Sequence, residues 1–91
     1  MAFYSIVWKQ SAQKELQKVN KKAIPKIIQA VEALSLEPHP AGSRKLHGAD
    51  HTYRLRTGSY RIVYSVYPDI ITIEIIRVGH RKDIYRNLPR R

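Results

Sequence analysis

The sequence predicts an α+β fold in which a two-helix hairpin packs on one face of a twisted antiparallel sheet, in the order β-α-α-β-β-β. Two observations favour this fold. Apolar residues recur at helical spacing in the first half of the chain, whereas in the second half they alternate with polar residues between turn-forming segments. The chain has 91 residues, which suits one hydrophobic core, so we expect a single domain spanning residues 1–91.

The first half is expected to form one strand and two helices. Residues 3–8 are β-branched and aromatic, which is typical of a strand. Ser11 can cap a helix that runs to about Asn20. Pro25 is tolerated in a first helical turn, and the apolar residues that follow it predict a second helix to about Leu36.

The second half is expected to form a three-stranded meander. A loop with two prolines and a glycine, residues 37–42, precedes it. The expected strands are 52–56, 60–67 and 70–78. The turns between them are Thr57-Gly58-Ser59 and Pro68-Asp69, and Gly79 is expected to permit a sharp turn into the C-terminal tail.

The expected hairpins assign side chains to the two faces of the sheet. We pair Arg56 with Arg61 and Tyr67 with Ile70, because these pairings put a wholly apolar and aromatic set on one face. The covered face then holds Tyr53, Leu55, Ile62, Tyr64, Val66, Ile71, Ile73 and Ile75. The open face holds Arg54, Arg56, Arg61, Val63, Ser65, Thr72, Glu74, Ile76 and Val78.

Three arginines therefore converge on the open face. Like charges this close repel one another unless an anion lies among them. A structural ion pair with Glu74 is the competing interpretation.

The net charge indicates a polyanionic partner. Seventeen Lys and Arg against seven Asp and Glu give a formal charge of +10, which attracts RNA, DNA, ribosomes or an acidic protein. The absence of cysteine excludes disulfides and thiolate metal sites. The chain shows neither a signal-peptide pattern nor an apolar run long enough to cross a membrane, so we expect a cytoplasmic protein.

The segment that follows Gly79 adds groups suited to RNA chemistry. His80 and Tyr85 are a candidate acid–base pair, and Tyr85 can also stack on a base. Further candidates for RNA binding are Arg44, Lys45, Lys82 and Arg86.

Together these residues resemble the RelE family of the RelE/ParE toxin superfamily. The resemblance covers nearly the whole chain and is carried by Leu46-His47-Gly48, Tyr53-Arg54-Leu55-Arg56, Gly58-Ser59-Tyr60-Arg61-Ile62-Val63-Tyr64 and Val78-Gly79-His80-Arg81-Lys82-Asp83-Ile84-Tyr85. It implies the toxin of a type II toxin–antitoxin system, a ribosome-dependent endoribonuclease that cleaves messenger RNA in the decoding site. In this chemistry the ribose 2′-hydroxyl attacks the adjacent phosphate.

The resemblance also implies the partners and cofactors of the protein. It implies that no metal or cofactor is used, and that a RelB-like antitoxin holds the toxin inactive. An acidic, partly disordered antitoxin segment suits a chain of charge +10.

Individual roles follow from the resemblance position by position. Arg54 and Arg56 match two family lysines beside the scissile phosphate, and Arg61 matches the arginine that clamps it. Arg81 matches the arginine that assists the leaving group, and Tyr85 matches the tyrosine that stacks on the nucleotide.

The chain departs from the family at its proton-transfer groups. Arginine is a poor general base, so Arg54 and Arg56 are unsuited to accept a proton in the place of the family lysines. We expect proton transfer to involve His80, because an imidazole exchanges protons near neutral pH. His47 is a second candidate for the same role.

Other functions remain open at this stage. A ParE-like toxin shares the fold but inhibits DNA gyrase, and it would not need the arginine cluster together with Arg81 and Tyr85. A non-catalytic basic module would bind RNA or a ribosomal surface without cleaving it, and a decayed, inactive toxin is a further alternative.

Overall fold

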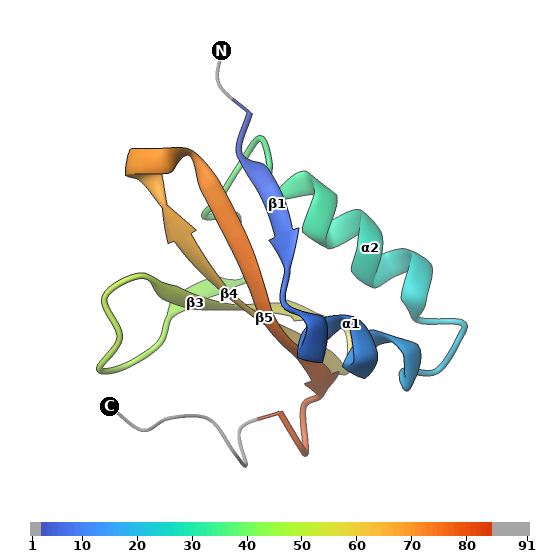
Figure 1. The fold of residues 1–91 in the computed structure, drawn as a ribbon. Coiled ribbons are helices and arrows are strands. Elements are labelled where there is room, and N and C mark those ends of the chain that lie inside the picture. The colour runs from blue at the N-terminus through green and yellow to red at the C-terminus, as the bar shows by residue number, and fades with distance from the viewer. Residues whose placement is uncertain (1–2, 85–91) are drawn as a thin grey trace.

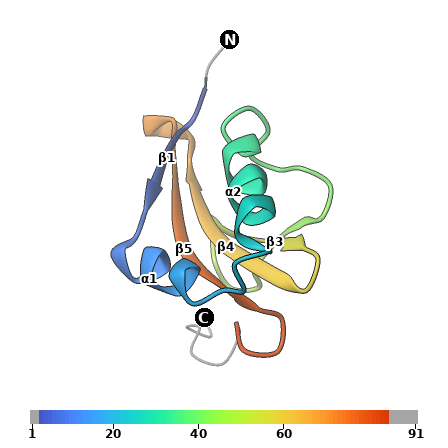
Figure 2. The ribbon, with the colours of Figure 1, turned by 90° about the vertical axis from the view of Figure 1, so that its right-hand side faces the viewer.

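The computed structural model describes residues 3–84 (Figure 1). Its strands are β1 (Ser5–Trp8), β2 (Ser43–Lys45), β3 (Thr52–Thr57), β4 (Tyr60–Tyr67) and β5 (Thr72–His80). Its helices are α1 (Gln10–Gln17), α2 (Ile24–Ala33) and the short 3-10 helix η1 (Pro68–Ile70). Both α-helices lie on the same side of the sheet, α1 over β5 and α2 over β3 and β4 (Figures 1 and 2). The predicted α+β class is confirmed.

The sheet is mixed rather than wholly antiparallel. Its strand order is β1-β5-β4-β3-β2, and β1 pairs with β5 in parallel. The helices and three further strands lie between β1 and β5 in the chain, so no short hairpin forces these two strands to be antiparallel. The edge strand β2 was not predicted, because a three-residue Ser-Arg-Lys segment has no apolar alternation.

The helix ends differ from the predicted ones. β1 ends at Trp8 and α1 begins at Gln10, so Lys9 alone connects them. The amide of Lys9 still donates to Ile75 O of β5, at 3.0 Å. Ser11 lies inside α1, and its predicted capping role is wrong. Pro25 occupies the first turn of α2, as predicted. The helix ends at Ala33 rather than near Leu36, because the following amides turn back to carbonyls three residues earlier.

The core lies between the helices and the covered face of the sheet. It consists of Ala12, Val19, Ile27, Val31, Leu34, Leu55, Ile62, Tyr64, Val66, Ile73, Ile75 and Val78. Every residue predicted for the covered face belongs to this core or packs against it, except Ile71. Ile71 has a left-handed backbone (φ 48°) after η1 and is 43% exposed.

The strand register explains which side chains lie on the face of the sheet that was predicted for them. Arg56 faces Arg61, as predicted, whereas Tyr67 faces Thr72 instead of Ile70 because η1 lengthens the turn. This shift is by two residues and therefore leaves Ile73 on its predicted face.

A β-bulge changes the faces further along β5. Tyr64 pairs with Ile75 and Val63 pairs with Arg77, which leaves Ile76 as an extra residue. The alternation is shifted by one residue beyond it, so Val78 enters the core and its predicted place on the open face is wrong.

Gly79 does not form the predicted turn. It lies within β5, and the chain reverses after His80, where the amides of Asp83 and Ile84 donate to His80 O. A Cβ at Gly79 would lie 3.2 Å from the Cδ1 of Ile84, whose side chain is fully buried. The glycine therefore allows the segment after β5 to pack closely against the strand.

Candidate nucleic-acid interface

Four arginines lie on the face of the sheet that the helices leave open. Arg44 is opposite Arg54, and Arg56 is opposite Arg61. Residues opposite each other share a face, and Arg54 and Arg56 flank the buried Leu55, which points to the core. We call Arg44, Arg54, Arg56 and Arg61 the arginine face.

Within the described residues, no carboxylate is paired with the arginine face. The ion pair that residues 3–84 contain joins Glu15 to Arg77, with 2.8 Å between Oε2 and Nη2. Glu74 lies opposite Ser65, toward the other end of β4 from Arg61. The competing interpretation, an ion pair with Glu74, therefore finds no support in this part of the chain, and the positive charge is available to an anion.

The guanidinium of Arg61 is held at the turn between β3 and β4. Its Nη1 donates to the carbonyl oxygens of Gly58 and Tyr60, both at 2.9 Å. Gly58 has a φ of 58°, a left-handed conformation that glycine adopts without strain. The remaining N–H groups of Arg61 can still donate to a phosphate.

Arg81 joins the same turn from the end of β5. Its amide donates to Ser59 O at 2.8 Å, and its side chain is exposed. Arg61 and Arg81 are far apart in sequence, yet both donate a hydrogen bond to the turn between β3 and β4, Arg61 from its guanidinium and Arg81 from its amide. Lys82 follows Arg81 and is also exposed.

His80 lies on the other side of the sheet from the arginine face. It is opposite Tyr60, which packs against the core, and the two ring centroids are 5.6 Å apart in an edge-on arrangement. The bulge at Ile76 is the reason, because it shifts the alternation of β5 by one residue. The Nδ1 of His80 accepts the amide of Lys82 at 3.1 Å. The role of His80 in proton transfer stays a prediction.

The other candidate residues are placed less uniformly. Lys45 is opposite Tyr53 and therefore lies on the covered side, away from Arg44. His47 is exposed in the loop between β2 and β3. Tyr85 and Arg86 lie outside the described residues.

The phenol of Tyr64 anchors the loop that leads into β2. Its hydroxyl donates to Pro38 O at 2.7 Å, and the ring is fully buried. Burial raises the pKa of Tyr64, and the nearby Ser43 hydroxyl partly opposes this effect. The neutral phenol thus helps to fix the chain segment from which Arg44 projects.

Sequence reasoning missed Glu15 and Arg77, which link α1 to the end of β5. One signal was present. Glu15 lies between Ala12 and Val19 at helical spacing, so an acidic residue is placed on the apolar side of α1. In residues 3–84 the His, Asp and Glu side chains form no group of three or more that could hold a metal ion.

Comparison with known proteins identifies similar sequences over most of the chain. The family model described as the ParE toxin of the type II toxin–antitoxin system parDE matches residues 6–85. Toxin RelG of Mycobacterium tuberculosis is 31% identical over 84 residues, which cover 91% of this chain and 97% of the relative. A putative toxin RelE1 of Methanocaldococcus jannaschii is 30% identical over 77 residues, covering 81% of this chain and 86% of the relative.

Solved structures show the same fold. The RelBE2 toxin–antitoxin complex of Mycobacterium tuberculosis contains a chain that matches with a TM-score of 0.78 and 27% identity, covering 91% of this chain and 97% of that one. The archaeal RelE–RelB complex of Pyrococcus horikoshii contains a chain that matches with a TM-score of 0.78 and 28% identity, covering 89% and 98%.

Proposed function

Because the chain belongs to the RelE/ParE family of toxins from type II toxin–antitoxin systems, we propose that it is a ribosome-dependent endoribonuclease that cleaves messenger RNA in the decoding site. The observation that supports this most strongly is the arginine face, which has no paired carboxylate in residues 3–84. The relatives named RelG and RelE1 favour the same activity.

The proposed reaction needs positive charge more than it needs a metal ion. The 2′-hydroxyl gives up its proton to a base and its oxygen attacks the phosphorus. The bond to the 5′-oxygen breaks and that oxygen takes up a proton, so the products carry a 2′,3′-cyclic phosphate and a 5′-hydroxyl. Arg54, Arg56 and Arg61 would stabilise the charge that develops on the phosphorane oxygens. Arg81, at the same turn as Arg61, would stabilise the leaving oxygen.

Proton transfer is proposed for His80. Since its Nδ1 accepts the amide of Lys82, a neutral imidazole carries its hydrogen on Nε2 and can donate a hydrogen bond to the reacting phosphate. Transfer of a proton to the leaving 5′-oxygen would require the imidazolium form, in which Nδ1 carries a hydrogen and releases the Lys82 amide. RNA bound to Arg61 has to pass around the end of β5 to reach this ring. His80→Ala is expected to retain RNA binding and to lower the cleavage rate, and an unchanged rate would remove His80 from the mechanism.

The proposed partners are the ribosome, messenger RNA and a RelB-like antitoxin. The RelBE2 and RelE–RelB structures are toxin–antitoxin complexes, which supports the antitoxin. A chain of charge +10 suits an acidic antitoxin segment and ribosomal RNA in a cytoplasmic setting. No helix in residues 3–84 has the length and apolar character to cross a membrane.

Primer extension on a defined messenger RNA, with and without ribosomes, tests the proposal. The wild type is expected to cut within codons only when ribosomes are present. Arg61→Ala and Arg81→Ala are each expected to lower the rate by about a hundredfold or more, which is typical for removal of a donor to developing charge. Lys14→Ala is the matched control, since it removes one exposed positive charge from α1.

Gyrase inhibition is the second candidate function, because the matching family model is described as a ParE toxin. If folded wild-type protein makes no cuts on ribosomes but inhibits supercoiling by gyrase, the nuclease proposal is wrong and this alternative holds. RNA binding without either activity would indicate a non-catalytic module.

A further inference from the structure

The outer edge of β5 is covered by a strand in its first half and by a helix in its second. β1 pairs with β5 only as far as Trp8 and Ile75, and the chain then enters α1. In the described residues, no strand lies beside Ile76–His80 on this side. The amides of this stretch therefore need other acceptors.

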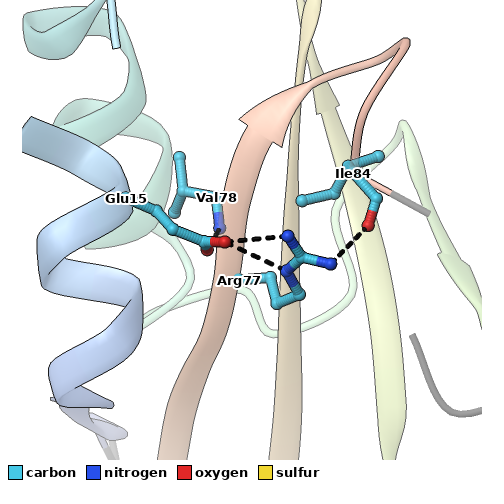
Figure 3. Close-up of polar contacts among 4 residues, drawn as sticks. All are labelled: Glu15, Arg77, Val78 and Ile84. Atoms are coloured by element: carbon cyan, nitrogen blue, oxygen red, sulfur yellow. Dashed lines mark hydrogen bonds and ion pairs between the residues drawn. The ribbon is translucent and has the colours of Figure 1, made fainter. Parts of the chain in front are cut away.

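Glu15 of α1 supplies these contacts (Figure 3). Its Oε1 accepts the amide of Val78 at 2.9 Å, as a neighbouring strand's carbonyl would. Its Oε2 accepts both Nε and Nη2 of Arg77, at 3.1 and 2.8 Å. One carboxylate thus fixes both the backbone of β5 and the orientation of the Arg77 guanidinium.

Arg77 also forms a hydrogen bond to the segment that follows β5. Its Nη1 donates to Ile84 O at 3.0 Å (Figure 3). The amide of Ile84 in turn donates to His80 O at 3.0 Å. The side chain of Ile84 packs on Gly79 and is fully buried. Residues 81–84 are thereby held at both ends. At one end the amide of Arg81 donates a hydrogen bond to Ser59 O, and at the other Ile84 is hydrogen-bonded to Arg77 and His80.

We propose that Glu15 and Arg77 are positioning residues. They hold residues 81–84 so that Arg81 lies at the turn between β3 and β4, to which the Arg61 guanidinium is hydrogen-bonded. The proposal rests on the cleavage function proposed above. Glu15 projects from α1. The strand register puts Arg77 on the same side of the sheet as Arg54, since both are opposite Val63, but its guanidinium is engaged by Glu15 at the edge of β5. Both side chains are partly exposed, 28% for Glu15 and 22% for Arg77. Apart from the bonds between them, their side-chain hydrogen bonds go to the Val78 amide and to Ile84 O, at the end of β5 and just beyond it. Their effect is therefore local to the segment that they hold.

Two conservative variants separate positioning from general stability. Arg77→Lys keeps the charge but lacks the fork that reaches Glu15 and Ile84 at once. Glu15→Gln keeps an acceptor for the Val78 amide but loses the negative charge. Glu32→Gln is the matched control, because Glu32 is an exposed carboxylate on α2.

The first readout is amide hydrogen exchange followed by NMR, which does not depend on activity. Arg77→Lys and Glu15→Gln are expected to lower protection at Arg81 and Ile84 by roughly tenfold, while Ile73 and Ile75 stay as protected as in the wild type. Unchanged protection at Arg81 and Ile84 in both variants overturns the proposal. Loss of protection throughout the sheet also overturns it, since that would indicate a global role.

The second readout is the rate of ribosome-dependent cleavage in a double-mutant cycle. Arg77→Lys is expected to lower the rate roughly tenfold in the wild type, and to have no further effect in Arg81→Ala. Effects that multiply in the double mutant would overturn the proposal. If the wild type cuts no RNA, the proposed function fails, whereas the exchange result still decides whether Glu15 and Arg77 hold residues 81–84.

Discussion

If the arginine face binds the RNA backbone, the affinity for single-stranded RNA must fall with salt by an amount that the structure sets. Each neutralised phosphate contributes about −0.7 to the slope of log K against log salt concentration for single strands. With one phosphate on each arginine of the arginine face, the slope is about −2.8. The affinity would then fall about 50-fold between roughly 50 and 200 mM salt.

Replacing one arginine of this face tests that estimate. Arg54→Ala is expected to make the slope shallower by about 0.7, because one ion fewer is released on binding. Arg54 projects from the middle of β3, and its side chain donates no hydrogen bond to the described residues, so the fold should be retained. The measurement is fluorescence anisotropy of a labelled 2′-O-methyl oligonucleotide, which binds without being cleaved.

Lys14→Ala serves as the control for net charge, since it removes one exposed charge on the helical side of the molecule. Its slope is expected to match that of the wild type. An equal change in Arg54→Ala and Lys14→Ala would refute the reasoning, because the affinity would then reflect overall charge instead of contacts on one face. A wild-type slope near zero would refute it as well.

Two further predictions concern the elements that support the site. Tyr64→Phe removes the 2.7 Å hydrogen bond to Pro38 O and should cost about 1–2 kcal/mol, lowering Tm by roughly 4–15 °C in a calorimetric scan. Because burial raises the pKa of Tyr64 in the folded state, the stability from its neutral form is complete below about pH 10 and is lost as pH rises through the folded pKa. Urea unfolding should therefore show a steeper alkaline loss for the wild type than for Tyr64→Phe, and equal losses would contradict this account. Gly79→Ala places a methyl group 3.2 Å from Ile84 Cδ1 and should destabilise the fold by about 1 kcal/mol in the same assay. Gly79→Val should cost more, and no loss in either variant would show that Ile84 does not pack there.

The sequence by itself determined the fold class and the grouping of the central arginines. Alternation along β3 and β4 depends only on neighbouring residues, and the short turn at Gly58 sets Arg56 opposite Arg61. A slip of one residue would have buried these charges, so the apolar pattern allowed a single register there. The charge of +10 indicated a polyanionic partner in the same direct way.

Only the tertiary structure decided the parallel pairing of β1 with β5, the strand β2, and the positions of Val78 and His80. The bulge at Ile76 moves both residues to the covered face, and no local pattern in the strand signals it. The bulge lies where β5 pairs with β4 and is contacted by α1, which are segments distant in the chain. Likewise Glu15 meets Arg77 only once α1 lies beyond the end of β1. Contacts between distant segments are decided by packing of the whole core, and for this reason the local sequence pattern did not contain them.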